Sequence, residues 1–429
     1  MEPDKATLSY DGQDYALPVV TGSDGKPALD LTDLRRKTGL LAFDPSLMNT
    51  AVTRSEITWI DSENGKLLYR GYSVEQLVQE SSYVEVAYLL TNGELPTPSQ
   101  YAEYSTTLSK HSLIHEAMRN FFDGFPGTAH PLAILATMVT ALSSYYPDTY
   151  ESHKEQGVDV KARLLAKVRT LAAMAYKKSI GQPIVYPRDE LPYCANFLNM
   201  MFAIPAEAYT VPADDEKILN QILILYSDHE QNVATSTVRL LGSTRANLFV
   251  CINAGISALW GSREASYSLH TIPMLTTMLN NRMSPERFFE KFISGHEPLK
   301  SSAFGHRKYK TVDPRARISR ELFHAYYRTH AQKRDPLMEI ALEVEEFTLG
   351  HTYFKELGFY PNLDFYSALI FRLMGIPTNM NNVIRCIGKL AGWLAQWSEQ
   401  RAETKHRQMR PQQVYSGMME RPFKPVSER

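Results

Sequence analysis

The segment VEQLVQESSYVEVAYLLTNGELP, from Val74 to Pro96, decides how the rest of the chain is interpreted. Its apolar residues recur three and four positions apart, and it ends at Asn92-Gly93 shortly before Pro96. This spacing is typical of an amphipathic helix, and a Gly with a Pro just beyond it is typical of a helix end. The sequence therefore predicts helical structure from Ser73 onward.

The segments on either side of this one complete the prediction of the fold. Before Ser73 the pattern alternates as in β-strands: LSYDGQDYALPVV turns at Asp11-Gly12, and EITWID and KLLYRGY flank Asn64-Gly65, which predicts two hairpins. After Pro96 the helical spacing returns in Thr106–Phe122, His130–Tyr146, Val160–Ser179, Glu190–Phe202 and DDEKILNQILILYSDHEQN. We therefore expect a mainly α protein with a small N-terminal β unit.

Composition is that of an ordinary globular chain. The 429 residues have 44% hydrophobic and 22% charged side chains and a formal net charge of -1, so charge gives no reason to expect nucleic acid or an acidic membrane as a partner. The cysteines Cys194, Cys251 and Cys386 lie far apart and predict neither a disulfide framework nor a metal site. The N-terminus lacks the apolar core of a signal peptide, and no uncharged run reaches the roughly 20 residues that span a bilayer. We expect a cytoplasmic protein.

Two polar segments in apolar surroundings carry histidines. SDHEQN, from Ser227 to Asn232, places His229 at the end of an apolar helix, a pattern that a solvated helix end explains equally well. AFGHRKYKTVDPRA, from Ala303 to Ala316, surrounds His306 with cations, which suits a histidine that donates to an oxyanion, although a basic surface loop is the alternative.

The same loop contains candidates for anion binding. Lys308 and Lys310 could hold phosphates as point charges, whereas Arg315 offers a planar fork for a carboxylate. His111 and His115 have the spacing of a metal-binding helix, but no acidic third ligand lies near them in the sequence, and we predict no metal site.

An acidic residue in the segment FYPNLDFYS has apolar neighbours. Asp364 lies among Leu, Phe and Tyr, an environment that raises the pKa of a carboxylate and suits a general base for a carbon acid. The alternative is that Asp364 caps the following helix, and one carboxylate can serve both purposes.

Together with the central segment WGSREASYSLHTIPML, these segments resemble the active-site segments of the citrate synthase family in its bacterial hexameric form. The likeness extends from the N-terminal hairpin to RPQQVYSG and includes KKSIGQPIVYPR, NFLNMMF and GWLAQWSE. It implies a fold with a large and a small helical domain beside the N-terminal β unit. The implied boundaries are 1–50 for the β unit, 51–276 with 385–429 for the large domain, and 277–384 for the small domain.

The resemblance also implies a reaction and roles. An acyl-CoA such as acetyl-CoA is enolised, the enol attacks the keto carbon of a 2-oxo acid, and the thioester is hydrolysed, with no permanently bound cofactor. Asp364 is the implied base, His306 and His229 donate to the keto oxygen, and Arg315 binds a carboxylate. The implied coenzyme A contacts are Phe304, Gly305, Lys308 and Lys310. A homodimer or homohexamer is implied, with Arg410 acting from the neighbouring subunit and the irregular residues after Gln400 covering a surface.

Two positions depart from the family pattern. Glu264 stands where the family has the histidine that stabilises the enol oxygen, and His270 lies roughly 240° further around a helix, so it cannot replace that histidine without a rearrangement. Losing such a donor costs about 10²–10³ in rate. Lys389 stands where the family has an arginine for the carboxylate of the oxo acid, and a compact cation suits a tetrahedral oxyanion as well as a planar one.

The hexameric relatives bind NADH at an inhibitory site, and this chain keeps matching residues at His111, Tyr146, Arg163 and Lys167, with Lys110 in place of an arginine and Ala206 where a cysteine often stands.

Three functions follow from the resemblance. The first is a condensing enzyme for oxaloacetate or an analogue such as phosphonopyruvate, the second a true citrate or 2-methylcitrate synthase, and the third an inactive paralogue with a binding or regulatory role.

Overall fold

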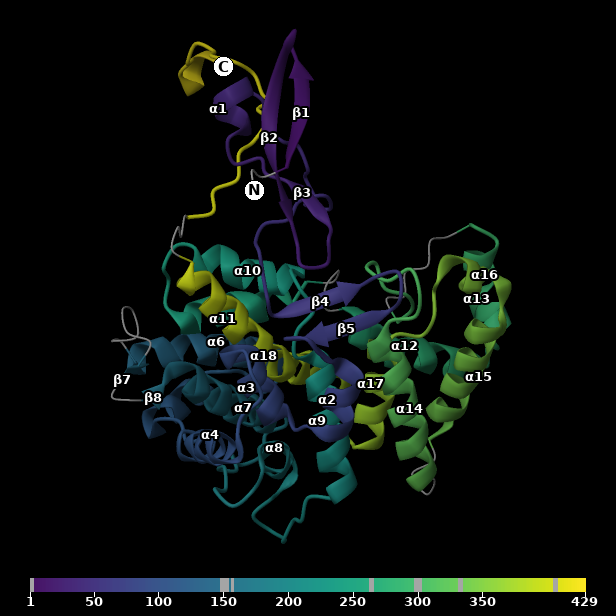
Figure 1. Cartoon of the computed structure of the whole chain (residues 1–429). Coiled ribbons are helices and arrows are strands. Elements are labelled where there is room, and N and C mark those ends of the chain that lie inside the picture. Colours follow the sequence, from purple (N-terminus) through teal and green to yellow (C-terminus); the bar gives the residue numbers. More distant parts are fainter. Residues whose placement is uncertain are drawn as a thin grey trace. The chain divides into compact units, whose positions relative to one another are not determined.

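A computed structural model describes residues 4–146, 154–155, 158–261, 266–296, 303–330, 335–403 and 408–429. Helices dominate, which confirms the predicted mainly α class (Figure 1). The chain divides into two compact units: the first combines the residues up to Ser55 with those from Gln408 onward, and the second runs from Glu56 to Arg407. The predicted boundary between a large and a small helical domain stays a prediction.

The first unit contains the predicted N-terminal hairpin. Strands β1 (Lys5–Tyr10) and β2 (Gln13–Thr21) pair antiparallel across Asp11 and Gly12, which both have positive φ, as a two-residue hairpin turn requires. Strand β3 (Pro27–Leu29) completes the sheet, and helix α1 (Leu34–Thr38) follows. Large apolar side chains of this unit are exposed, Phe43 by 75% and Phe423 by 80%.

The second unit begins with the other predicted hairpin and is otherwise helical. Its small sheet has the order β4-β5-β6 (Thr58–Asp61, Lys66–Tyr69, Tyr72–Ser73), and β7 (Lys154–Glu155) pairs with β8 (Val158–Asp159). The helices that follow β6 are α2 (Val74–Glu80), α3 (Tyr83–Asn92), α4 (Pro98–Lys110), α5 (Arg119–Asp123), α6 (Pro131–Leu142), α7 (Val160–Ser179), α8 (Tyr193–Phe202), α9 (Ala213–Tyr226), α10 (Val233–Gly242), α11 (Leu248–Ala258), α12 (Ser266–Asn281), α13 (Pro285–Ile293), α14 (Pro314–Thr329), α15 (Pro336–Gly350), α16 (Thr352–Leu357), α17 (Leu363–Leu373) and α18 (Asn381–Ala402).

Helix α18 lies at the centre of the second unit. It packs against α3, α7, α9 and α10 and is buried along almost its whole length, whereas α17 packs against α12 and α14 (Figure 1). Three loops that the sequence singled out begin or end at these helices: residues 227–232 join α9 to α10, residues 303–313 precede α14, and residues 358–362 precede α17. The packing of α18 and α17 therefore determines where these loops lie.

One predicted helix is wrong. The segment Thr106–Phe122 is not one helix, because α4 ends at Lys110 and the chain turns before α5. The cause is tertiary: the carbonyl oxygen of Ser112 accepts from Thr170 at 2.8 Å and its hydroxyl accepts from Arg169 at 2.5 Å, and both donors lie on α7. His111 and His115 therefore do not share a helix face. Across the parts of the chain that the structure describes, every helix is too short or too polar to cross a bilayer.

Candidate active site

Two glycines on α18 allow the loop after α9 to approach the helix closely. A Cβ at Gly388 would lie 2.6 Å from the Cβ of Tyr226, and a Cβ at Gly392 would collide with the carbonyl oxygen of Ser227. That oxygen instead accepts a hydrogen bond of 3.1 Å from the backbone nitrogen of Gly392. The contact fixes the end of α9, and two residues after Ser227 the chain reaches His229, which is buried.

Asp228 anchors this loop. Its Oδ2 accepts hydrogen bonds from the Thr58 hydroxyl at 2.6 Å, from the backbone nitrogen of Glu230 at 3.1 Å and from Gln396 at 3.5 Å. Burial raises the pKa of Asp228 to about 6, against the opposing effect of these hydrogen bonds and of the Lys389 ammonium. The carboxylate therefore holds the strand β4, the loop and α18 together at one point.

His229 and His306 lie side by side in the site. Their ring centroids are 4.8 Å apart, and Nε2 of His229 lies 3.1 Å from the Tyr309 hydroxyl. Nδ1 of His306 accepts a hydrogen bond of 3.1 Å from the backbone nitrogen of Lys308, so the neutral ring carries its proton on Nε2. The structure thus brings together two imidazoles that the sequence placed 77 positions apart.

Both imidazoles are neutral at neutral pH. Burial, followed by the charge of Arg315, lowers the pKa of His306 to about 4. Burial and then Arg315 also lower the pKa of His229 well below its usual value. Each ring is therefore a hydrogen-bond donor that keeps its proton, which suits the polarisation of a carbonyl oxygen rather than the release of a proton.

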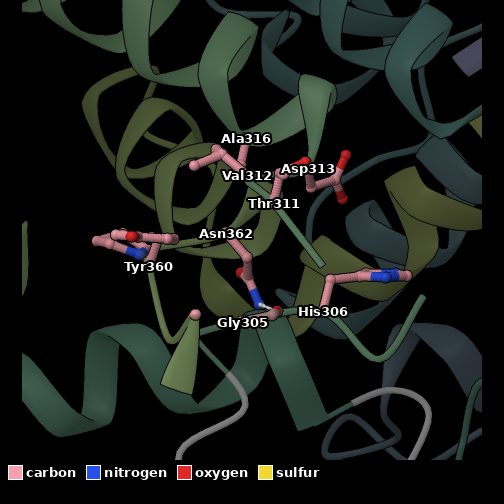
Figure 2. A pocket seen from close by; sticks show the side chains of 10 residues that line it. Gly305, His306, Thr311, Val312, Asp313, Ala316, Tyr360 and Asn362 are labelled. Carbon is pink, nitrogen blue, oxygen red and sulfur yellow. Dashed lines mark hydrogen bonds between the residues drawn. The ribbon is translucent and has the colours of Figure 1, made fainter. Parts of the chain in front are cut away.

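The loop that carries His306 is joined to the loop before α17. The backbone nitrogen of Gly305 donates to the backbone carbonyl oxygen of Tyr360 at 2.7 Å. The side-chain nitrogen of Asn362 donates to the carbonyl oxygen of Gly305 at 3.2 Å (Figure 2). Gly305 has φ +71, and a Cβ there would lie 2.9 Å from the Phe359 ring, so only glycine fits. A pocket lies at this junction, lined by Gly305, His306, Thr311, Val312, Asp313, Ala316, Gly358, Tyr360, Pro361 and Asn362 (Figure 2).

Asp364 lies in the first turn of α17 and does not cap that helix. The cap is Asn362, whose side-chain oxygen accepts from the backbone nitrogen of Asp364 at 3.0 Å and from that of Phe365 at 3.2 Å. Oδ1 of Asp364 accepts from the Tyr226 hydroxyl at 3.4 Å and forms an ion pair with Arg385 of α18. The Asp364 carboxylate therefore does not cap α17. The sequence predicted apolar neighbours for it, but Tyr226 and Arg385 contact it with polar groups.

Arg315 forms a tight pair with Asp313. Its Nε lies 3.1 Å and 3.2 Å from the two oxygens of that carboxylate, and its Nη2 lies 2.8 Å from Oδ2. Asp313 also caps α14 by accepting from the backbone nitrogen of Arg315 at 2.9 Å. His229, His306 and Asp313 have atoms close enough to hold a metal ion. The set does not suit a cation, because Arg315 occupies both oxygens of Asp313 and Lys389 adds a further positive charge.

The residues predicted to contact coenzyme A differ in their surroundings. Phe304 is buried, with its ring centroid 5.6 Å from that of Phe289 and 5.9 Å from that of Phe365, so it supports the loop from inside. Lys308 is exposed and lies 3.5 Å from Glu230, and Lys310 is exposed and lies 2.6 Å from Glu63. The two ammonium groups thus stand at the surface, on the same loop as Gly305.

A second cluster forms around α7. The guanidinium carbon of Arg163 lies 4.6 Å from the ring centroid of Tyr146, and Nζ of Lys167 lies 5.7 Å from it. Burial lowers the pKa of Lys167 to about 8, helped by Arg163. Burial also lowers the pKa of His111, with contributions from Arg163 and Lys167. The four residues matched to the family's NADH site therefore lie in one place.

The remaining predicted residues are distributed as follows. Lys389, one of the buried residues of α18, acts electrostatically on Asp228, His229 and His306. Arg410 is exposed and belongs to the other compact unit. Glu264 lies outside the described residues, and His270 on α12 is exposed.

The sequence interpretation missed Arg385, Asp313 and Asp228. Arg385 had a usable signal, because it precedes Lys389 by four positions and therefore lies on the same face of α18. Asp313 had one as well, because Asp before Pro314 is a pattern typical of a helix start.

Comparison with known proteins agrees with this geometry. The sequence profile "Citrate synthase, C-terminal domain" matches residues 46–412. "Citrate synthase 1" from two strains of Mycobacterium tuberculosis is 42% identical over 427 residues, covering 99% of this chain and 99% of the relative.

Solved structures are similar over almost the whole chain, which confirms the predicted citrate synthase fold. Citrate synthase from Pyrobaculum aerophilum has a TM-score of 0.79 at 28% identity, covering 95% of this chain and 97% of the other. Citrate synthase from Thermoplasma acidophilum, in a ternary complex with carboxymethyl coenzyme A and oxaloacetate, has a TM-score of 0.81 at 26% identity, covering 90% of this chain and 100% of the other. On this profile, this identity and this fold, the chain belongs to the citrate synthase family.

Proposed function

We propose that this chain is an acyl-CoA:2-oxo acid condensing enzyme. Asp364 takes a proton from the methyl group of acetyl-CoA, and the resulting enol attacks the keto carbon of the oxo acid while His229 and His306 donate to the keto oxygen. Water then hydrolyses the thioester and releases coenzyme A. Arg315, Lys389 and an Arg410 contributed by a second subunit bind the acidic groups of the oxo acid.

One observation carries this proposal. Two neutral imidazoles lie with their ring centroids 4.8 Å apart, and the loop of one of them is hydrogen-bonded to the loop that precedes the buried carboxylate of Asp364. A base without a capping role and donors that keep their protons are what enolisation and attack on a carbonyl require. The relatives support the same chemistry, since one of them is described in a complex with carboxymethyl coenzyme A and oxaloacetate.

Two positions at which the resemblance implies a substitution bear on the reaction: Lys389 on the oxo acid and Glu264 on the enolisation of acetyl-CoA. Lys389 offers a compact ammonium group where the family has the planar guanidinium of an arginine. An ammonium group suits a tetrahedral anion as well as a planar one. Glu264 replaces an imidazole where the thioester oxygen gains negative charge, and an ionised carboxylate there would oppose enolisation. We therefore propose that oxaloacetate is not the best substrate and that an analogue such as phosphonopyruvate reacts faster.

The direct test measures thiol release from acetyl-CoA with a panel of 2-oxo acids. Release with phosphonopyruvate in preference to oxaloacetate supports the proposal. Faster release with oxaloacetate favours a true citrate synthase, or a 2-methylcitrate synthase if propionyl-CoA is the better donor. No release with any oxo acid favours an inactive paralogue that binds ligands.

Two variants sharpen the assignment of the substrate site. Lys389→Arg restores the family residue and should shift preference toward oxaloacetate by about tenfold, since a fork binds a planar carboxylate in two places. Glu264→Gln should keep most of the activity if the side chain donates a hydrogen bond as a neutral group. Near-complete loss in Glu264→Gln would contradict that role.

A homo-oligomer with shared sites is part of the proposal. The exposed apolar side chains of the first unit, among them Phe43 and Phe423, suit a protein interface. Arg410→Leu and Asp364→Asn should each be inactive alone. An equal mixture refolded together should recover up to about a quarter of wild-type activity, since each mixed dimer rebuilds one complete site. A mixture as inactive as its components would place Arg410 in its own subunit's site or in none.

Inhibition by NADH is also part of the proposal. Arg163, Lys167 and Tyr146 form a buried cationic and aromatic cluster that suits a phosphate-bearing ligand. NADH should lower the thiol-release rate of the wild type, and Lys167→Gln should remove that effect without lowering the uninhibited rate. An equal response of wild type and variant would exclude the cluster as the NADH site.

A further inference from the structure

Arg385 contacts the carboxylate to which the proposed function assigns the role of base. Its Nη2 forms an ion pair with Oδ1 of Asp364, which links α18 to α17. Arg385 is 6% exposed and Asp364 is 8% exposed, so the pair is formed away from bulk water. A guanidinium in this position compensates the negative charge that an ionised base carries.

The guanidinium is only partly used. Among the described residues, its contacts are the single ion pair with Asp364 and a position 5.2 Å above the Tyr226 ring, and its buried Nε makes no hydrogen bond. A buried N–H without an acceptor is costly and therefore unusual in folded proteins. The open edge of Arg385 thus lacks an acceptor that a bound molecule can supply.

The position of Asp364 indicates where that acceptor forms. In acetyl-CoA the methyl carbon and the thioester oxygen are bonded to the same carbon, so a base at the methyl group lies close to the oxygen as well. The guanidinium of Arg385 carries several N–H donors in one plane, and its Nη2 already contacts the Asp364 carboxylate. A second N–H of the same group can therefore reach the thioester oxygen.

We propose that Arg385 is a catalytic residue that stabilises the enolate oxygen of acetyl-CoA, an inference that rests on the condensing function proposed above. In this step Asp364 forms an O–H bond with the methyl proton, the C–H electron pair becomes the C=C bond, and the carbonyl π pair becomes a lone pair on oxygen. Arg385 keeps all its protons. Negative charge leaves the carboxylate and appears on the oxygen, and the same cation compensates it before and after.

This role also bears on position 264, where the resemblance aligns Glu264 with the family's histidine. The charge on the thioester oxygen needs a donor, and Glu264 in its ionised form would not be one. The guanidinium of Arg385 offers N–H donors and no acceptor, so it supplies this stabilisation without transferring a proton. Lys389, one helical turn further along α18, acts instead on Asp228, His229 and His306. Of the two cations of α18, Arg385 thus acts on the acyl-CoA and Lys389 acts on the side of the oxo acid.

Carboxymethyl-CoA is the probe that tests this role, because it carries a negative charge where the enolate forms. Its dissociation constant and that of CoA are measured by calorimetry in the presence of the oxo acid that supports thiol release, or of oxaloacetate. In Arg385→Leu, affinity for carboxymethyl-CoA should fall by about 10²-fold while affinity for CoA changes little, and the rate of thiol release should fall by about 10²–10³-fold. Arg385→Lys should recover part of both losses.

Controls separate this role from a structural one. Arg372 also pairs with an aspartate, Asp335, but the pair lies near the surface, with the Arg372 side chain 39% exposed. Arg372→Leu should leave the preference for carboxymethyl-CoA unchanged. Because Arg385→Leu can fail to fold, Arg385→Lys and Arg385→Gln are measured beside it, and Gln should lose the preference that Lys partly keeps.

Other outcomes overturn the inference in distinct ways. A lower rate with an unchanged preference for carboxymethyl-CoA over CoA would make Arg385 a positioning residue for Asp364. A higher KM for the oxo acid with that preference unchanged would assign Arg385 to the oxo acid. A wild-type protein that neither releases thiol nor binds CoA would refute the condensing function, and this inference with it.

Discussion

Two buried arginine–aspartate pairs lie at this site, and they differ in how completely the arginine is used. Arg315 binds both oxygens of Asp313 through two of its nitrogens, whereas Arg385 reaches only one oxygen of Asp364 and keeps a buried Nε without an acceptor. We call the first the closed pair and the second the open pair. The closed pair is satisfied by the protein itself, while the open pair is satisfied only when a further acceptor is present.

The two pairs also differ in how the fold forms them. The residues of the closed pair are two positions apart, at the start of α14, where Asp313 caps the helix. The residues of the open pair are on different helices, Asp364 in the first turn of α17 and Arg385 on α18. The closed pair therefore stabilises the start of α14, whereas the open pair places a cation beside the proposed base.

The largest expected effect is on chemistry in the open pair. Asp364→Asn keeps the shape of the side chain but removes the base, so thiol release should fall by about 10³–10⁴-fold. Initial rates with acetyl-CoA and the preferred oxo acid measure it, with circular dichroism as a check of folding. A variant that keeps more than a tenth of the wild-type rate would mean that another group takes the proton.

The next effect is on stability in the closed pair. Asp313→Asn leaves Arg315 buried without its two-oxygen partner, and the free energy of unfolding should fall by about 3–5 kcal/mol. Urea unfolding measures this loss. Asp335→Asn, in the half-exposed pair with Arg372, is the matched control and should cost no more than about 1 kcal/mol. Equal losses in the two variants would remove the distinction between the pairs.

The difference between the pairs explains how much the sequence could predict. An aspartate before Pro314 indicates a helix start, so the sequence DPRA, from Asp313 to Ala316, contains a local signal for the closed pair. His229, His306 and Asp364 were identified from their residue types, their polar segments and a family resemblance. Both hairpins and the exact bounds of α7, Val160–Ser179, followed from periodicity and turn residues.

The rest depends on contacts between distant segments. The sequence predicted an apolar environment for Asp364, because its neighbours in the chain are apolar, but Arg385 reaches it from 21 positions away. The meeting of His229 with His306 requires the close approach at Gly388 and Gly392 and the junction of the two loops at Gly305. Such contacts have no local signal, since a glycine within a helix shows only that something approaches closely, not what it is.

A substitution at Gly392 should disturb the open pair more than the closed one. Gly392→Ala places a methyl group against the Ser227 oxygen, which pushes α18 and Arg385 away from their neighbours. Overpacking of this kind costs about 1–3 kcal/mol, and thiol release should fall by about tenfold. Gly350→Ala is the control, because a Cβ there meets nothing within 4 Å. An Ala at position 392 that is as harmless as the one at 350 would show that α18 can shift freely.

The smallest effect concerns the protonation of His306, which lies close to the closed pair. Burial and the Arg315 charge lower the pKa of His306 to about 4, whereas an unfolded histidine has a pKa of about 6.5. Below about pH 6.5 the unfolded chain binds the extra proton first, so the folded state loses stability as pH falls toward 4.

His306→Gln removes this loss. Between about pH 7 and pH 5.5, urea unfolding of the wild type should show about 1 kcal/mol more loss than the variant. Asp228, whose pKa burial raises to about 6, titrates in the opposite sense but equally in both proteins. Parallel pH profiles would mean that His306 is protonated in the folded state near pH 6, and that the imidazole is not the neutral donor that the keto oxygen requires.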